Sequence, residues 1–159
     1  MAQLTGGEGP SVLIHEVSQE ECRDVLQRVH LARLACARRD QPYLVPISVY
    51  FDGEYLYSFS IVGQKIDWMR SNPKVCVEVD DIEDESHWTT VLVFGRYEEL
   101  TDAPADRDGR NRASELLEQR REFWLPAAAK LPSTEHTTPV VYRIRIDRLT
   151  GRRAARHRT

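Results

Sequence analysis

The sequence lacks any run of apolar residues long enough to cross a bilayer, and its N-terminus has no charged-then-apolar signal pattern. We therefore expect a cytoplasmic protein without a membrane partner. The sequence also lacks a strong excess of one charge, since the formal net charge is -3 over 159 residues. Such a balance argues against broad electrostatic binding of nucleic acid.

The sequence has few cysteines and no metal-ligand spacing. Cys22, Cys36 and Cys76 form no C-x-x-C pair, so we expect three small buried side chains rather than a zinc or dithiol site. The histidines show no H-x-x-H spacing and are expected at the surface or in turns: His15, His30, His87, His136 and His157. His87 adjoins a strand expected near the site described below. A catalytic role stays open for it, although a structural role is the simpler interpretation.

The composition is typical of one soluble domain, with 41% hydrophobic and 30% charged residues. We expect residues 1–16 to form a flexible leader, residues 17–150 the domain, and residues 151–159 a basic tail. A solvated end is a simpler interpretation of the tail than a binding site.

Residue patterns predict a mainly β chain with flanking helices. Helices are expected from the capping box Ser18–Glu21, after the turn at Gly63, and from Ala113 to Trp124. Six strands are expected at about 31–38, 42–51, 55–59, 75–79, 88–100 and 140–147. Because tight turns join several of these strands, we predict a six-stranded antiparallel barrel.

Two residues interrupt the predicted strands. Pro46 cannot donate to a ladder, so its strand belongs at an edge or a bulge and leaves backbone groups for another partner. Gly95 is expected to mark a bulge in the fifth strand.

The segment Tyr57–Pro73 predicts an anion site. It reads as the end of a strand, a turn at Gly63, and a short amphipathic helix that stops at Asn72. Small hydroxyls, free N–H groups at the helix start and Lys65 would converge there, as a phosphate group requires. Most strand-turn-helix crossings bind only water. The segments on either side therefore have to decide whether this turn binds an anion or only water.

The order and spacing of several segments resemble a known family. The segments are Leu34-Ala35, Pro42–Val49, Asp52-Gly53, Leu56-Tyr57, Gly63–Lys65, Asn72–Val79, Trp88–Val91 and Phe94–Glu99. Together they resemble the pyridoxamine 5′-phosphate oxidase-like superfamily, and within it the branch of flavin-nucleotide-binding proteins and nitroimidazole-resistance reductases. The resemblance implies a split β-barrel homodimer that binds two FMN molecules at the subunit interface.

The resemblance also implies which residues bind the cofactor. The phosphate positions fall on Ser60, Gln64 and Lys65, and Gly63 in the same turn is also implied as a cofactor-binding residue. The residues implied along the isoalloxazine ring are Pro46, Ile47, Ser48 and Val49. The residues implied to approach the cofactor, from the same or the other subunit, are Trp88, Thr89 and Thr90.

Two departures separate the sequence from the true oxidases. Gln64 stands where those enzymes have an arginine, and His157 and Arg158 lie beyond the last strand instead of forming the substrate-phosphate pair. The resemblance therefore does not extend to a vitamin-pathway oxidase. No catalytic residue is assigned, because a flavin carries the hydride chemistry itself.

Three functional hypotheses follow. The first is an FMN-dependent oxidoreductase that moves electrons from a nicotinamide donor to a small organic acceptor. The second is a flavin or heme binding protein without turnover. The third is a reductase that uses a deazaflavin coenzyme. Gln64, in place of the arginine of the true oxidases, suggests this alternative. In each case a homodimer is expected, with Phe123, Trp124 and Trp88 as apolar area for the partner.

Overall fold

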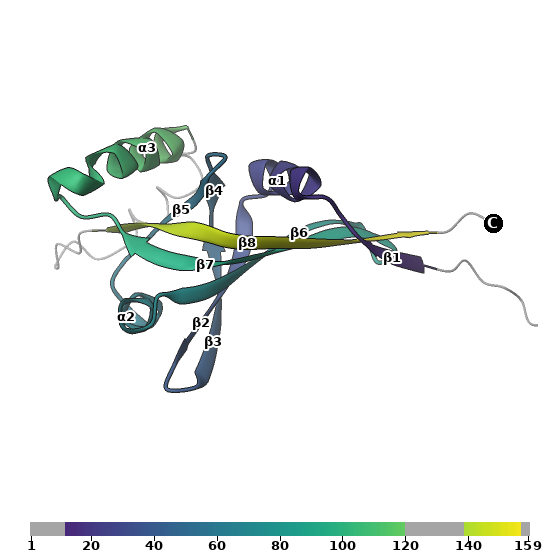
Figure 1. Ribbon diagram of the computed structural model, residues 1–159, viewed down its shortest axis with the longest axis horizontal. Helices are drawn as coiled ribbons and strands as arrows, with labels where there is room; N and C mark the ends of the chain where they lie inside the picture. The colour runs from purple at the N-terminus through teal and green to yellow at the C-terminus, as the bar shows by residue number, and fades with distance from the viewer. Residues whose placement is uncertain (1–11, 120–138, 157–159) are drawn as a thin grey trace, which may run out of the picture.

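The computed structural model describes residues 12–119 and 139–156, which form a curved sheet with helices around it (Figure 1). The strands are β1 (Val12–Glu16), β2 (Leu31–Arg38), β3 (Gln41–Ser48), β4 (Tyr50–Phe51), β5 (Tyr55–Ser60), β6 (Lys74–Asp84), β7 (His87–Glu99) and β8 (Val140–Arg156). The helices are α1 (Gln19–Arg28), α2 (Gln64–Ser71) and α3 (Arg107–Glu118), with a 3-10 turn at Pro104–Asp106. The predicted mainly β chain with flanking helices is confirmed. Within the described residues, no helix has the length and apolarity that a membrane crossing needs.

The sheet is an eight-stranded antiparallel sheet, so the predicted number of six is wrong. Its order is β3-β2-β6-β7-β8-β5-β4, and β1 pairs with β8 outside this path. The sequence patterns missed β1, and they merged β3 with β4 into one strand. The two separate at Val49, whose N–H donates to the carbonyl oxygen of His30 at 2.9 Å instead of to a neighbouring strand.

β3 and β4 stand at opposite ends of the strand order, although only Val49 separates them in the chain. The sheet therefore curls until its two ends approach each other, without closing into a continuous ladder. We call the opening between β3 and β5 the split. A side-chain hydrogen bond crosses it, from Ser58 Oγ on β5 to the carbonyl oxygen of Ser48 on β3, at 2.7 Å.

Local signals place α1 and α2 where the sequence predicts them. Ser18 Oγ accepts from the Glu21 N–H at 3.2 Å, and the Glu21 carboxylate accepts from the Ser18 N–H at 2.9 Å, which completes the capping box. α2 follows Gly63 and ends at Asn72, whose Nδ2 donates to the Ala37 carbonyl oxygen on β2 at 3.0 Å. Both ends of α2 are therefore fixed relative to the sheet.

The ordered sheet extends beyond the expected domain boundaries at both ends. β1 pairs with the end of β8 from Val12 opposite Arg156 to Glu16 opposite Arg152. Residues 12–16 of the expected leader and 151–156 of the expected tail are thus strand, because each supplies the backbone partners that the other needs. The predictions for His136, His157, Phe123 and Trp124 fall outside the described residues.

Two of the three cysteines are buried as expected. Cys22 and Cys36 lie in the core, but Cys76 is half-buried, so the prediction for Cys76 is wrong. The reason is strand alternation: Val75 and Val77 of β6 face the core, and Cys76 between them faces the other side.

Gly95 lies at a register shift between β7 and β8, which confirms the predicted bulge. A Cβ atom at this position would lie 2.4 Å from the carbonyl oxygen of Arg145. Only glycine allows β8 to approach β7 this closely.

Candidate functional site

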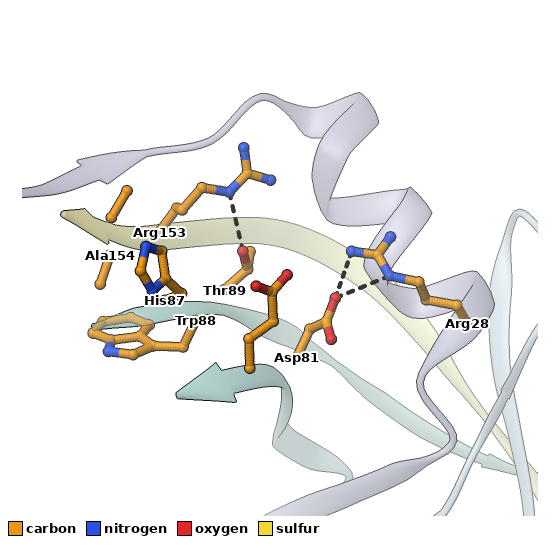
Figure 2. A pocket seen from close by; sticks show the side chains of 9 residues that line it. Arg28, Asp81, His87, Trp88, Thr89, Arg153 and Ala154 are labelled. Carbon is orange, nitrogen blue, oxygen red and sulfur yellow. Dashed lines mark hydrogen bonds and ion pairs between the residues drawn. The ribbon is translucent and has the colours of Figure 1, made fainter. Parts of the chain in front are cut away.

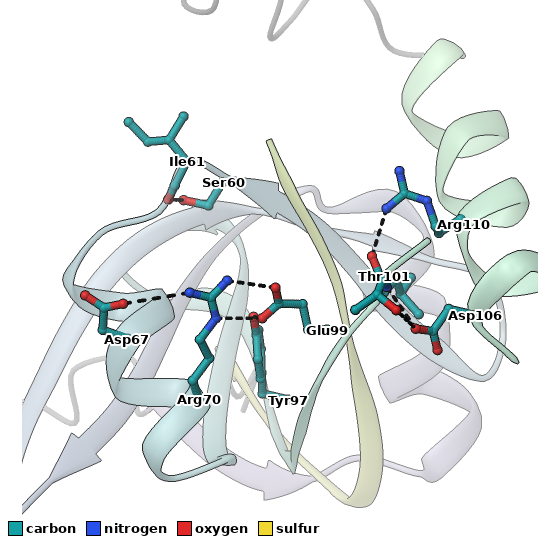
Figure 3. Close-up of polar contacts among 10 residues, drawn as sticks. Ser60, Ile61, Asp67, Arg70, Tyr97, Glu99, Thr101, Asp106 and Arg110 are labelled. Carbon is teal, nitrogen blue, oxygen red and sulfur yellow. Dashed lines mark hydrogen bonds and ion pairs between the residues drawn. The ribbon is translucent and has the colours of Figure 1, made fainter. Parts of the chain in front are cut away.

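The predicted phosphate segment folds as a strand end followed by the start of α2. β5 ends at Ser60, whose hydroxyl donates to the Ile61 carbonyl oxygen at 2.9 Å (Figure 3). Gly63 is the N-cap of α2 in an extended conformation and supplies no side-chain cap. The first turn of α2 therefore has N–H groups that no capping side chain satisfies, together with the positive end of the helix dipole.

Lys65 lies in this first turn and is half-buried. Burial lowers the pKa of its ammonium group, because the charged form loses hydration there. Within residues 12–119 and 139–156, no carboxylate forms an ion pair with Lys65. The side chain lies close enough to the buried Cys36 for its charge to act on that thiol. A half-buried cation without a carboxylate partner is suited to an external anion.

A bidentate ion pair holds α2 in place behind Lys65. Arg70 Nε and Nη2 donate to the two carboxylate oxygens of Glu99 on β7, each at 2.8 Å (Figure 3). Tyr97 Oη also donates to Glu99 at 2.8 Å. The hydrogen bonds from Arg70 lower the pKa of the Glu99 carboxyl, which therefore stays ionised and keeps the helix fixed.

β3 supports the interpretation of Pro46 as an edge residue. β3 stands at one end of the strand order, so its free side faces the split. The side chains of Pro46 and Ser48 are exposed, whereas Ile47 and Val49 are buried in the core. Of the four predicted ring contacts, the side chains of Ile47 and Val49 are therefore unavailable, and the Val49 N–H already donates to His30.

The start of β7 divides the three predicted residues between two faces of the sheet. Trp88 and Thr90 lie on one face, where Thr90 Oγ1 donates to Asp80 at 2.6 Å. The Thr89 side chain is on the other face and accepts from Arg153 Nε at 3.1 Å. Thr89 is thus held by β8, and its hydroxyl is directed away from the face of Trp88 and Thr90.

An open pocket of about 210 Å³ lies between α1, the β6–β7 turn and β8, and both Thr89 and Trp88 line it (Figure 2). Its two guanidinium groups are already paired: Arg28 with Asp81 at 2.6 Å, and Arg153 with Glu21 at 2.7 Å. These pairs tie α1 to the sheet. His87 lines the pocket, and its Nδ1 is 2.9 Å from a carboxylate oxygen of Asp84 in the same turn.

The residues predicted around the start of α2 and those at the start of β7 form two separate groups, and Pro46–Val49 lie nearer the second by register, since Ile47 shares a row with Ala32, Val79 and Val91. The row of Ala35, Cys76 and Phe94 crosses β2, β6 and β7, and Ala35 adjoins Cys36, on whose thiol the charge of Lys65 acts. Trp88 is six residues further along β7, which is about 20 Å, and pairs with Ala154 beside β1. One chain therefore brings Ser60, Gly63, Gln64 and Lys65 together near the split, but leaves Trp88 and Thr90 far from them.

Comparisons with known proteins agree on one family. Residues 18–153 match the sequence profile described as pyridoxamine 5′-phosphate oxidase. The chain belongs to this family. An uncharacterized protein of Rhizobium meliloti (strain 1021) is 40% identical over 146 residues, which cover 90% of this chain and 97% of that protein.

Solved structures of other proteins have the same fold. A FAD-binding protein of Mesorhizobium loti is 36% identical, with a TM-score of 0.76 over 91% of this chain and 99% of that one. A proposed 5-nitroimidazole antibiotic resistance protein of Bacteroides thetaiotaomicron has a TM-score of 0.66 at 14% identity, over 92% of this chain and 90% of that one. The second similarity concerns the fold alone.

Sequence reasoning missed the residues that support the site in this member of the pyridoxamine 5′-phosphate oxidase family. Arg70 and Glu99 are 29 positions apart, and Arg153 and Thr89 are 64 apart. Neither spacing carries a motif. The one available signal was Ser58, a small hydroxyl inside an aromatic strand, which donates across the split.

Proposed function

We propose that this protein binds a flavin, and that FMN is its cofactor. The single observation that supports the proposal best is Lys65, a half-buried ammonium in the first turn of a helix without a capping side chain. The FMN phosphate is a dianion, and it would accept hydrogen bonds from the helix start and from Lys65. The 36% identical FAD-binding protein of Mesorhizobium loti supports a flavin as the ligand.

The flavin ring would lie along the free side of β3, in the split. Pro46 and Ser48 are exposed, and among the strands that the structure describes none pairs with the other side of β3. Backbone N–H and C=O groups of an edge strand can bind the polar edge of a flat ring. Ser58 holds the two sides of the split together beneath the proposed ring site.

A second copy of the chain would complete the site. Along β7, Trp88 lies about 20 Å and Thr90 about 13 Å from the row that contains Phe94. In a two-fold dimer, these residues of one chain could face the flavin held by the other. We therefore propose a homodimer with the cofactor at the interface.

The proposed activity is oxidoreduction, with electrons passing from a nicotinamide donor to a small organic acceptor. The bound flavin would supply the hydride and electron transfer. The chain's own residues would bind the phosphate, orient the ring along β3, and exclude water with Trp88. A flavin or heme binding protein without turnover, and a reductase that uses a deazaflavin coenzyme, are the alternatives.

The first test is an absorption spectrum of the purified protein, with mass spectrometry of the small molecule that heat releases. We expect an oxidised-flavin spectrum and the mass of FMN. The mass of FAD would mean that the cofactor is FAD and not FMN. The mass of a deazaflavin or heme would favour the corresponding alternative. A colourless protein that also fails to bind added FMN and FAD would overturn the proposal.

Turnover needs a separate measurement, because binding does not establish catalysis. Oxidation of NADH or NADPH is followed with a nitro-compound or a quinone as acceptor. We expect bound flavin to be reduced by one of the two donors and reoxidised by the acceptor. A flavin that neither donor reduces would leave a binding protein without turnover.

A further inference from the structure

The pocket beside α1 has its own chemistry, and apart from Trp88 its residues have no role in the proposed function. It has a volume of about 210 Å³ and lies between Arg28 of α1, the β6–β7 turn and Arg153 of β8 (Figure 2). That volume corresponds to about seven water molecules of about 30 Å³ each, and it is below the roughly 300 Å³ at which pockets for drug-sized ligands begin. A ligand of this pocket would therefore be a small molecule with one ring.

The charges that line the pocket disfavour an anion. Arg28 is paired with Asp81 at 2.6 Å, and Arg153 is paired with Glu21 at 2.7 Å. Glu83 also lines the pocket, and none of the described cations pairs with it. A phosphate or a carboxylate would therefore meet two neutralised cations and one carboxylate that repels it.

Hydrogen-bond donors remain on both guanidinium groups. Arg28 donates to Asp81 through Nε and Nη2. Arg153 donates to Thr89 through Nε at 3.1 Å, and to Glu21 through Nη1 at 2.7 Å. In the part of the chain that the structure describes, Arg28 Nη1 and Arg153 Nη2 donate to no protein acceptor. The pocket can therefore donate to a ligand oxygen without gaining or losing a charge.

Hydrogen-bond acceptors line the same pocket. His87 Nδ1 is 2.9 Å from a carboxylate oxygen of Asp84, and the Ser86 N–H donates to the same carboxylate at 2.6 Å. Because a carboxylate only accepts, Nδ1 carries the proton of the neutral imidazole, and Nε2 is left as an acceptor. The Glu83 carboxylate is a second acceptor in the lining. The pocket can therefore also accept from an N–H group of a ligand.

Trp88 supplies apolar surface at the side of these polar groups. Its indole is half-buried and lines the pocket, together with the methyl groups of Ala154 and Ala155. A large aromatic side chain in a small polar pocket favours a flat ring as the ligand.

We infer that this pocket binds a small, uncharged aromatic amide. The amide oxygen accepts from the remaining N–H groups of Arg28 and Arg153, and the amide N–H donates to His87 or Glu83. An organic cation would bring donors only and would face the two guanidinium groups without an acceptor for them. The inference goes beyond the proposed function and does not rest on it, because the contacts need neither a flavin nor turnover.

Three compounds of one shape test the charge preference: benzamide, which is uncharged, benzoate, which is negative, and benzamidinium, which is positive. Each is titrated into ¹⁵N-labelled protein, as purified and again after any cofactor has been removed. The NMR signals of the Trp88 indole N–H and the Thr89 backbone N–H report on the pocket. Benzamide should shift both signals with a dissociation constant of about 1 mM, which is ordinary for a ligand of its size. The two charged compounds should bind at least about 3-fold more weakly, as is typical of charge effects at a solvent-exposed site.

A blocking variant tests the place of binding. Ala155 lines the pocket and is half-buried on β8. Ala155→Phe puts a ring into the pocket and removes no hydrogen bond of a side chain. It should weaken the binding of benzamide at least about 10-fold, because two rings cannot occupy the same space. Thermal unfolding checks that the variant folds.

A pair of charge variants tests the role of Glu83. Its side chain is exposed, so Glu83→Lys leaves the packing of the sheet unchanged. The variant replaces the carboxylate that repels anions, and benzoate should gain about 3-fold in affinity relative to benzamide. Glu85→Lys makes the same change of charge in the same turn, at a residue that does not line the pocket. In this matched control the ratio of the two affinities should stay as in the wild type.

The inference is overturned if benzamide at about 10 mM shifts neither pocket signal, or if a charged compound binds as tightly as benzamide. A folded Ala155→Phe chain with the affinity of the wild type would also overturn it. If that variant does not fold, the charge pair decides, and an equal affinity ratio in Glu83→Lys and Glu85→Lys overturns the inference. Benzamide binding by a chain that binds no flavin would remove the proposed function and leave the pocket site intact. Flavin binding by a chain that does not bind benzamide would remove the pocket site alone.

Discussion

Replacement of Lys65 by alanine should weaken the binding of FMN far more than the binding of riboflavin. Riboflavin has the same ring and ribityl chain but no phosphate, so it lacks the group that Lys65 is proposed to bind. The helix start remains in the variant, because the cap at Gly63 and the anchor at Asn72 do not involve the lysine side chain. The comparison of the two ligands therefore isolates the ammonium–phosphate contact.

The size of the effect follows from the position of the side chain. A hydrogen bond to a charged group contributes about 2 kcal/mol, and the half-buried Lys65 is poorly screened by solvent. We therefore expect about a 30-fold loss of FMN affinity, and about a 2-fold change or less for riboflavin. Arg107→Ala, which removes an exposed cation on α3, should leave both affinities unchanged.

Fluorescence titration of the apo protein with each ligand measures the four dissociation constants of the wild type and the Lys65→Ala variant. The reasoning is refuted if wild type binds FMN no better than riboflavin, or if the variant loses the same factor for both. The first result would remove the phosphate site. The second would mean that Lys65 supports the fold of the site rather than the phosphate.

Three further outcomes follow from the structure. Gly95→Ala should lower the free energy of unfolding by about 1–3 kcal/mol, because its Cβ would lie 2.4 Å from a carbonyl oxygen of β8; thermal or denaturant unfolding measures this, and an unchanged stability would contradict the close approach. Mixing Lys65→Ala with Trp88→Ala chains should recover FMN binding at one site per mixed dimer, because one site then has both residues intact, whereas unmixed variants stay weak in titrations. Glu99→Gln should lower the free energy of unfolding at pH values above 4.5, the ordinary carboxyl pKa, since Arg70 holds the pKa of Glu99 below that value. As the pH falls through the lowered pKa, the wild type loses the stability that the ionised carboxylate contributes. Unfolding curves of the two proteins should therefore converge over that pH range.

Local signals made part of the fold predictable. The capping box at Ser18 and the turn at Gly63 act within a few residues, and both helices begin where those residues place them. The pairing of β1 with the end of β8 could not be read in the same way. It joins Val12 to Arg156. Neither segment has a strong alternation of apolar and polar residues, and both are strands because each supplies the backbone hydrogen-bond partners of the other.

The candidate site shows the same division. Ser60 to Lys65 is one continuous segment, so its residues stay together in the structure. The remainder depends on pairings between distant strands, and these separate Trp88 from Lys65 in one chain. Strand alternation also turned Thr89 away from its neighbours, which a pattern of three adjacent residues does not reveal.

The 17-residue strand β8 has a consequence for how the chain is made. It pairs with β1, β5 and β7, which are all synthesised before it. Until Val140–Arg156 has emerged from the ribosome, those three strands lack their common neighbour, and their edges stay open to wrong partners. The native sheet should therefore assemble only after synthesis has passed β8, at the slow rate typical of distant strand pairing. In the cell, the nascent chain would depend on chaperones until then.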